Sequence, residues 1–291
     1  MAPLEAVAEG VIPATYWVRY PDMVLVAEGT PVCVTAEPAD GLKLTPAALD
    51  AAITPRTKWL ILNSPCNPSG TVLSAQELKG LAEVLDRHPH VWILADEIYE
   101  HILFDGRRFA SMAAVAPQLA SRTLTVNGVS KAYAMTGWRI GFAGGPPGLI
   151  RAMAKMQSQS TSSPSSVSQA AALAALTGPQ DIVRKHCAEF EARRDRFKPV
   201  LAAVPGLTCD LPHGAFYFFP RCEGWVGKRT PRGLVISTDE DAALYLLDSG
   251  VSLVHGGAYG ISPYFRVSFA TSMDNLGEAC RRIGEAAARL S

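Results

Sequence analysis

The sequence predicts an α/β protein, in which a mostly parallel sheet flanked by helices precedes a smaller C-terminal α+β domain. Short apolar runs alternate with longer helical stretches, which is typical of βαβ units and parallel strands. This pattern changes after Gly178. The chain has 291 residues, enough for one large or two ordinary domains. We therefore expect a larger domain over residues 1–178, a connecting helix over 179–204 and a smaller domain over 205–291.

The larger domain contains five candidate buried strands. They are Val32–Thr35, Trp59–Leu62, Val91–Ala95, Leu124–Val126 and Ile140–Ala143. A helix is expected between the second and third of these strands, and its first residues are visible in the sequence. Ser74 and Glu77 match the S-x-x-E capping box, and Leu78, Leu81 and Leu85 follow at helical spacing.

A long charged helix is expected from Gln180 to Val204. Four cationic residues near its end are expected to face solvent: Arg193, Arg194, Arg196 and Lys198. Beyond it, the sequence predicts a helix over Asp239–Ser249 and strands over Gly214–Phe219, Val251–Val254 and Phe265–Phe269. The last helix carries an apolar face made of Leu276, Cys280, Ile283, Ala287 and Leu290.

Charge and composition exclude several classes of protein. The 27 Lys and Arg residues balance 27 Asp and Glu, so the field that would attract nucleic acid or an anionic membrane is absent. The longest uncharged window, residues 156–180, is rich in Ser, Gln and Thr and would not span a bilayer. The six cysteines form no C-x-x-C pair and the six histidines no H-E-x-x-H motif. We therefore expect no metal site, and free thiols in a cytoplasmic protein.

Three polar clusters follow predicted strands directly, where ligands of open α/β sheets bind. They are Asn63–Gly70 (NSPCNPSG), Asp96–Tyr99 (DEIY), and Asn127–Lys131 (NGVSK) continued by Met135–Arg139 (MTGWR). Each cluster alone fits ordinary turn or helix-cap chemistry. Together and in this order they indicate a ligand-binding site.

The clusters together resemble those of class I pyridoxal-phosphate aminotransferases of the aspartate aminotransferase group. Asn63–Gly70 resembles the family's N-P-x-N-P-[ST]-G segment, with Ser64 at a variable position. Ser130–Gly141 resembles its S-K-x-x-x-M-x-G-W-R-x-G segment almost letter for letter. Further matches are Tyr16-Trp17, Gly256–Gly260 and Phe265–Ser268. The resemblance extends from about residue 11 to the C-terminus, and it implies a fold type I enzyme whose larger domain binds the cofactor pyridoxal 5'-phosphate.

The resemblance implies that Lys131 is the catalytic residue. This lysine would bond covalently to the cofactor aldehyde and then move a proton between the substrate α-carbon and the cofactor. Such an amine needs a depressed pKa, which partial burial and cationic neighbours would provide. Asp96 would face the pyridine nitrogen, and its negative charge would keep that nitrogen protonated.

The other implied cofactor contacts surround the ring and its phosphate. Tyr99 and Asn67 would hydrogen-bond the phenolic oxygen, and Trp17 would stack on the ring face. Arg139 would bind the phosphate with its planar guanidinium, assisted by Ser130.

Arg266, with Asn67, is the implied substrate contact. It lies in a predicted apolar strand, where an unpaired buried guanidinium would be very costly. Its partner is either the α-carboxylate of an amino acid, bound bidentately, or a protein carboxylate in a buried ion pair. The Ser-rich stretch Ser158–Ser168 has the composition of a linker, and the resemblance allows it to be an entrance loop near the active-site mouth.

Members of the family carry on the order of a hundred residues before the point that matches Val11. The resemblance implies that the chain lacks this segment, which supplies a glycine-rich phosphate turn and a tyrosine that reaches the partner subunit's phosphate site. The segment also forms much of the dimer interface. We therefore expect weaker cofactor binding and poorer solubility than in a longer relative, and a homodimer if the segment is not essential for it.

The leading interpretation is an aminotransferase that transfers an amino group between an L-amino acid, of aspartate or glutamate type, and a 2-oxo acid in a ping-pong cycle. One alternative is an impaired remnant that binds the cofactor weakly or not at all. Another is a lyase or decarboxylase that uses the same cofactor. An oxidoreductase is disfavoured because no G-x-G-x-x-G follows a predicted strand. A dicarboxylate substrate needs a second cation, and the sequence assigns no residue to it.

Overall fold

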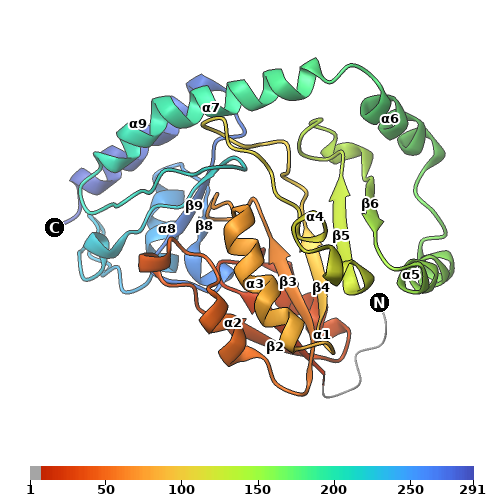
Figure 1. Cartoon of the computed structure of the whole chain (residues 1–291). Coiled ribbons are helices and arrows are strands. Elements are labelled where there is room, and N and C mark those ends of the chain that lie inside the picture. Colours follow the sequence, from red (N-terminus) through yellow and green to blue (C-terminus); the bar gives the residue numbers. More distant parts are fainter. Residues whose placement is uncertain (1–7) are drawn as a thin grey trace.

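The computed structural model describes residues 8–291, which form two sheets flanked by helices (Figure 1). The larger sheet has the strand order β2-β1-β3-β4-β5-β6. All neighbouring strands in it are parallel except β5 and β6. Its strands are β1 (Glu9–Pro13), β2 (Thr30–Val34), β3 (Thr57–Asn63), β4 (Trp92–Asp96), β5 (Thr123–Gly128) and β6 (Gly141–Gly144). The predicted α/β fold with a mostly parallel sheet is confirmed.

The five strands predicted for this sheet are all present, with their ends shifted by one or two residues. The inner strand β1 was not predicted. Only Val11 and Ile12 are large apolar residues in it, and Pro13 ends it, so the run is too short to stand out by periodicity. Its position depends on its neighbours in the sheet, since it pairs with β2 on one edge and with β3 on the other.

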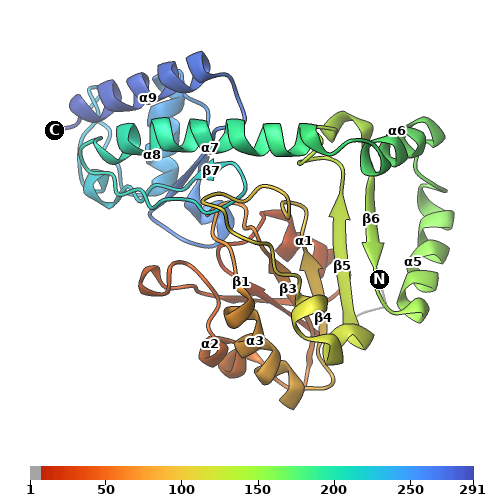
Figure 2. The same cartoon turned by 45° about the horizontal axis from the view of Figure 1, so that its top comes forward.

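Helices cover both faces of the larger sheet (Figures 1 and 2). They are α1 (Arg19–Val26), α2 (Pro46–Ala52), α3 (Ala75–Arg87), α4 (Met112–Val115) and α5 (Pro147–Ser160). Helices α2, α3 and α4 pack on one face around Leu60 and Leu81, and α1 and α5 on the other around Ile61 and Leu149. The capping box that starts α3 is confirmed, since the Ser74 and Glu77 side chains each accept a hydrogen bond from the other residue's backbone N–H.

The smaller sheet is antiparallel, in the order β7-β9-β8. Its strands are β7 (Tyr217–Phe218), β8 (Val254–His255) and β9 (Phe265–Ser268), and α8 (Asp239–Asp248) and α9 (Met273–Ala288) lie in the same region. The strand predicted over Gly214–Phe219 is therefore too long, and the one predicted over Val251–Val254 is displaced, since β8 shares only Val254 with it. The backbone N–H groups of Gly214 and Ala215 donate to carbonyls of the larger domain's loops, at Gly70 and Ile102, instead of pairing in the sheet.

Helix α7 (Asp181–Ala202) runs from one sheet region to the other, as predicted for residues 180–204 (Figure 2). The prediction that its four late cations face solvent is wrong for Arg194, whose side chain is only 2% exposed. Its guanidinium donates to both carboxylate oxygens of Asp105, at 2.7 and 2.8 Å, and lies over the Phe104 ring. The domain boundaries at residues 178 and 204 stay a prediction.

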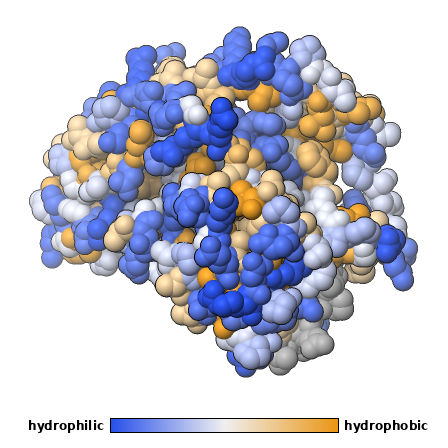
Figure 3. All heavy atoms as spheres, in the orientation of Figure 1, coloured by the Kyte–Doolittle hydropathy of each residue, from blue (hydrophilic) through white to orange (hydrophobic). Residues whose placement is uncertain are grey.

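The linker predicted over Ser158–Ser168 is mostly helical. Its first residues end α5 and its last begin α6 (Ser166–Thr177), so only residues 161–165 join two helices. Apolar side chains reach the surface here, among them Met156, Val167 and Leu173, and Figure 3 shows such exposed apolar atoms on the α6 side of the molecule. Among residues 8–291, no helix combines the length and apolar character needed to cross a membrane.

Candidate active site

A cavity of about 780 Å³ lies between the carboxyl edge of the larger sheet and strands β8 and β9. The eight residues implied by the resemblance all line it: Trp17, Asn67, Asp96, Tyr99, Ser130, Lys131, Arg139 and Arg266. Their side chains come from segments up to 249 residues apart in the chain. The fold therefore brings every predicted site residue to one place, and their individual roles stay predictions.

Strand register explains why the polar clusters meet. Asn63 pairs with Asp96 across β3 and β4, and Asp96 pairs with Val126 across β4 and β5. Because the three strands are parallel and in register, the loops after them leave the sheet at the same edge. The cluster after β3 is further ordered by Asn63, whose side chain accepts from the Asn67 backbone N–H and donates to the Asp96 carbonyl.

Among residues 8–291, Asp96 is the only carboxylate that lines the cavity. Burial raises its pKa, and a hydrogen bond from the Tyr20 hydroxyl to Oδ2, at 2.6 Å, opposes that shift. The Ile98 N–H donates to Oδ1, at 3.2 Å. A partly desolvated carboxylate held in this way is well suited to bind a cationic ring nitrogen.

Lys131 has the depressed pKa expected of it. Burial is the main cause, and the positive charges of Arg266 and Arg139 act in the same direction, while Asp96 opposes them. The amine lies 5.8 Å from the ring centres of both Tyr99 and Phe216. A lowered pKa increases the share of neutral amine, which is the form that attacks an aldehyde or accepts a proton.

Tyr99 is buried, and its hydroxyl lies 2.7 Å from the hydroxyl of Tyr217. Burial is the main cause that raises the pKa of Tyr99 well above its usual value, so the phenol is neutral and keeps its proton. Tyr217 belongs to β7, so this hydrogen bond joins the loop after β4 to the smaller sheet. It gives the phenol of Tyr99 a defined position at the cavity wall.

Arg266 in β9 has no carboxylate within 4.0 Å among residues 8–291, so the buried ion pair considered above is wrong for the described chain. One terminal nitrogen donates to Asn67 Oδ1, at 2.9 Å, and the guanidinium lies 4.6 Å from the Tyr217 ring centre. Its Nε is buried without a hydrogen-bond partner. A buried cation with unused donors fits an incoming carboxylate.

Arg139 and Trp17 lie toward the open side of the cavity. Arg139 follows the turn Thr136–Trp138 in the left-handed conformation (φ 54°), and its side chain donates to no described group except the Thr136 carbonyl. This leaves further guanidinium donors for a phosphate. Trp17 is partly exposed, with its ring edge-on to Tyr20 at 5.5 Å.

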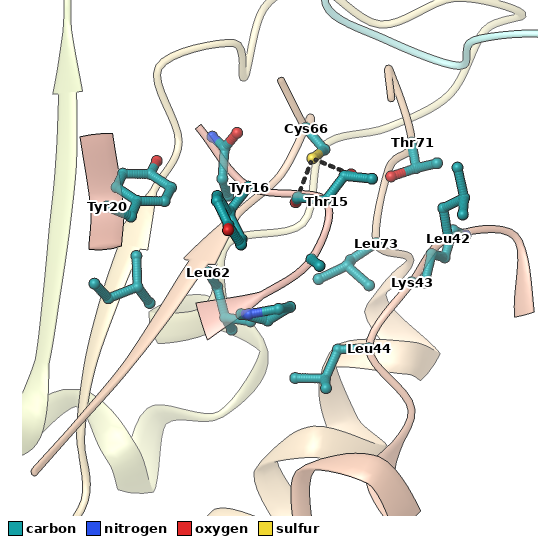
Figure 4. A pocket seen from close by; sticks show the side chains of 14 residues that line it. Thr15, Tyr16, Tyr20, Leu42, Lys43, Leu44, Leu62, Cys66, Thr71 and Leu73 are labelled. Atoms are coloured by element: carbon teal, nitrogen blue, oxygen red, sulfur yellow. Dashed lines mark hydrogen bonds between the residues drawn. The ribbon is translucent and has the colours of Figure 1, made fainter. Parts of the chain in front are cut away.

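A second cavity, of about 40 Å³, lies behind the first and shares Tyr20 and Asn63 with it. Figure 4 shows Cys66 in its wall, where the thiol donates a hydrogen bond to the Thr15 carbonyl oxygen and shares another with the Thr15 hydroxyl. A space of this size holds one or two water molecules and no cofactor. The larger cavity is therefore the candidate active site.

Four further residues shape the site and were not predicted from the sequence: Arg19, Tyr20, Tyr217 and Tyr259. Tyr20 lies three residues after Trp17 and Arg19 lies two after it, but nothing in the sequence ties either to Asp96 or to the cavity. Tyr259 lies in the predicted match Gly256–Gly260, so that motif was a usable signal.

The cavity suits an anionic aromatic cofactor and a substrate carboxylate. Its volume is within the usual range for small-molecule sites. It offers a carboxylate for a ring nitrogen, an amine of lowered pKa and a buried guanidinium with an unpaired Nε. These residues fit pyridoxal phosphate, and an α/β protein with such a site is an enzyme of amino-acid chemistry.

Comparison with known proteins defines this class further. The family model for aminotransferase class I and II matches residues 3–283. An aspartate aminotransferase of Rhizobium meliloti (strain 1021) is 55% identical over 292 residues, which cover 100% of this chain and 71% of the relative. An aspartate/prephenate aminotransferase of Cereibacter sphaeroides is 54% identical, over 97% of this chain and 71% of the relative.

Solved structures of aspartate aminotransferases also resemble this chain. The crystal structure of the Rhizobium meliloti aspartate aminotransferase matches with a TM-score of 0.96 and 54% identity, over 99% of this chain and 72% of that one. The Thermus thermophilus aspartate aminotransferase with maleate matches with a TM-score of 0.87 and 39% identity, over 98% of this chain and 71% of that one. The chain belongs to the class I and II aminotransferases, a family that transfers amino groups with the help of pyridoxal phosphate.

Replacing Tyr20 by Phe tests how Asp96 is held. The change removes the hydroxyl that lowers the pKa of Asp96, so that pKa rises and more of the carboxyl is protonated at a given pH. A protonated Asp96 no longer balances a cationic ring nitrogen. We expect the affinity for pyridoxal phosphate, titrated by absorbance, to fall about tenfold, with a deficit that grows as the pH falls.

The control is Tyr245→Phe, which removes a hydroxyl that donates to the Ala286 carbonyl outside the cavity. It should leave cofactor affinity and its pH dependence unchanged. Equal affinities of Tyr20→Phe and the unaltered chain at all pH values would contradict a role of Tyr20 in holding Asp96.

Proposed function

We propose that this chain binds pyridoxal phosphate in the larger cavity and transfers an amino group between a dicarboxylic L-amino acid, of aspartate or glutamate type, and a 2-oxo acid. The main support is that the Lys131 amine, the Asp96 carboxylate and the Arg266 guanidinium line one cavity. Family membership adds to it, as do relatives named aspartate aminotransferase and aspartate/prephenate aminotransferase.

The roles proposed for the residues follow from their charges and surroundings. When bound, pyridoxal phosphate withdraws electrons from the bond that the substrate α-carbon makes to hydrogen. Lys131, kept partly neutral by burial, accepts and returns the proton at that carbon. Asp96 holds the ring nitrogen in its protonated form, and Tyr99 donates to the phenolic oxygen from its fixed position.

The cofactor phosphate and the substrate α-carboxylate are bound by separate residues. Arg139, assisted by Ser130, binds the phosphate, and Trp17 covers the ring. Arg266 and Asn67 bind the substrate α-carboxylate, which would complete the unused donors of the guanidinium. We further propose that the protein acts in the cytoplasm as a homodimer, on the grounds of its free thiols and the exposed apolar side chains on α5 and α6.

Adding pyridoxal phosphate to the purified chain tests the proposal. Binding through Lys131 should produce a visible absorption band, and a reactive amino acid should then bleach it while one equivalent of 2-oxo acid is released. We expect aspartate or glutamate to react faster than alanine across a panel of amino acids.

Each outcome distinguishes between the interpretations. A band that no amino acid bleaches would favour the impaired remnant, and no band at all would contradict the proposed cofactor site. Release of carbon dioxide, or of ammonia with an unsaturated acid, would favour the decarboxylase or the lyase.

A further inference from the structure

Asp239 is a buried acidic residue outside the larger cavity, and the proposed function gives it no task. It is the first residue of α8, and only 3% of it is exposed. Helix α8 packs beside β8 and the turn Gly256–Tyr259 that follows it (Figure 1). A carboxylate is rarely buried so fully unless hydrogen bonds replace its lost water. The partners of Asp239 therefore indicate what its burial serves.

Among residues 8–291, the hydrogen bonds that the Asp239 side chain accepts all come from the loop over residues 256–264, which joins β8 to β9. Its Oδ2 accepts from the Gly257 N–H at 3.0 Å, the Ser262 hydroxyl at 2.9 Å and the Tyr264 N–H at 3.2 Å. Hydrogen bonds to a charged acceptor are stronger than those between neutral groups. Because the donors lie near both ends of the loop, one carboxylate oxygen holds the loop closed.

The N-terminus of α8 does not need Asp239 as a cap. The Thr238 hydroxyl accepts from the Asp241 N–H, and the Asp241 carboxylate accepts from the Thr238 N–H. This capping box satisfies the first exposed backbone groups of the helix. The Asp239 side chain therefore serves the loop rather than its own helix.

The loop that Asp239 holds forms part of the cavity wall beside Arg266. Tyr259 lies in its turn, is 1% exposed and lines the cavity. The centre of the Tyr259 ring lies 5.2 Å from the Arg266 guanidinium carbon. Tyr264, whose N–H donates to Asp239, stands two residues before Arg266 in the chain. The position of the loop therefore limits where this guanidinium can lie.

On its other side the loop contacts the segment that precedes Trp17. The Tyr16 N–H donates to the Tyr259 carbonyl at 3.2 Å. Gly260 has a φ of 80°, and an added Cβ there would lie 2.5 Å from the Tyr16 ring. The loop thus has no room to shift toward Tyr16, and Asp239 holds it from the side of α8.

We propose that Asp239 is a positioning residue for the substrate site, because it fixes the loop that keeps the Arg266 guanidinium in place for a carboxylate. The inference rests on the proposed function, since it takes Arg266 as the residue that binds the substrate α-carboxylate. Asp239 does not itself line the cavity. A guanidinium that is already held in place loses less conformational entropy when it binds its ligand, so a released loop weakens binding.

Hydrogen exchange and succinate binding test the two steps of this proposal in the chain loaded with pyridoxal phosphate. We expect Asp239→Ala to raise the exchange rate of the amides in residues 256–264 at least about tenfold, measured by mass spectrometry. Calorimetric binding of succinate should weaken about tenfold. The affinity for pyridoxal phosphate should stay unchanged, since its proposed contacts Asp96, Lys131 and Arg139 lie outside the loop.

Two milder variants keep the test decisive if Asp239→Ala does not fold. Asp239→Asn keeps the size of the side chain and one acceptor oxygen, so it should retain more of the succinate affinity than Asp239→Ala. Ser262→Ala removes one of the three donors from an exposed position and should change exchange and affinity in the same direction, by less. Unchanged exchange and affinity in both variants would contradict the proposal.

Glu240→Ala is the matched control. It removes the same charge from the same first turn of α8, at an exposed position beside Asp239. Loop exchange and succinate affinity should both stay as in the unaltered chain. Changes as large as those of Asp239→Ala would assign the effect to charge at the helix end and overturn the proposal.

The remaining outcomes separate this inference from the proposed function. Unchanged loop exchange in Asp239→Ala overturns the inference alone, as does faster exchange with unchanged succinate affinity, which would make Asp239 a purely structural anchor. Arg266→Gln should weaken succinate. If it does not, or if the unaltered chain binds no succinate, the proposed substrate site is wrong and the inference fails with it.

Discussion

Replacing Lys131 by Ala abolishes the visible absorption band of the cofactor-loaded chain and lowers amino-transfer activity by at least about 10³-fold. Two losses combine in this variant. The amine that bonds to the aldehyde is gone, and so is the group that exchanges a proton with the substrate α-carbon. In the part of the chain that the structure describes, no other lysine lines the cavity to substitute for it.

Absorbance after mixing with pyridoxal phosphate gives the first readout, and single-turnover release of 2-oxo acid from aspartate gives the second. Lys155→Ala, which removes an exposed lysine of α5, is the matched control and should behave like the unaltered chain. A band of full intensity in Lys131→Ala would show that another amine carries the cofactor, and the proposed mechanism would then be wrong.

Replacing Arg194 by Met lowers the free energy of unfolding by about 2–4 kcal/mol. The guanidinium is buried and makes a bidentate ion pair with Asp105, a hydrogen bond to Asp195 and another to the Pro212 carbonyl. Methionine keeps much of the volume but leaves the Pro212 carbonyl without its donor. The expected loss is smaller than for a fully buried pair, because the Asp105 side chain is 42% exposed and regains water.

Chemical denaturation at neutral pH measures the loss, and Arg193→Met on the same helix is the control. Arg193 pairs with Glu189 at 3.6 Å near the surface, so its replacement should cost less than about 1 kcal/mol. Equal stabilities of the two variants would contradict a structural role of the Arg194 pair.

The stability that Arg194 contributes depends on pH, because its ion-pair partner Asp105 titrates. Hydrogen bonds from Arg194 hold the pKa of Asp105 below its usual value. A carboxyl group with a lowered pKa stabilises the folded chain above its unfolded pKa, and this contribution disappears as the pH falls through the folded pKa. The stability difference between the unaltered chain and Arg194→Met should therefore be full at neutral pH and shrink below about pH 4.

Local signals in the sequence were sufficient for much of the fold. Five strands of the larger sheet appeared as short apolar runs, and the capping box at Ser74 marked the start of α3 correctly. In the smaller sheet the strand at Phe265 was predicted to within one residue, whereas the one over Gly214–Phe219 was predicted too long, because hydrogen bonds from Gly214 and Ala215 to distant loops interrupt it. The inner strand β1 was missed because five residues ending in Pro13 carry too little pattern.

The residues of the candidate site also fall into two groups, those predicted from the sequence and those found only in the structure. Its eight predicted residues lie in motifs directly after strands or in matched segments, so a resemblance could locate them. Tyr20 and Tyr217 lie outside such motifs, and only the folded chain brings their hydroxyls to Asp96 and Tyr99.

The sequence by itself determined which chemical groups this protein carries and after which strands they stand, because strand periodicity and motif spacing are local properties. The tertiary structure alone decided which of those groups are paired. Arg194 is neutralised by Asp105 while Arg19 and Arg266 keep unused donors, although all three are arginines in ordinary helical or strand segments. Burial and pairing set the pKa and the binding capacity of a side chain, and both depend on contacts between segments far apart in the chain.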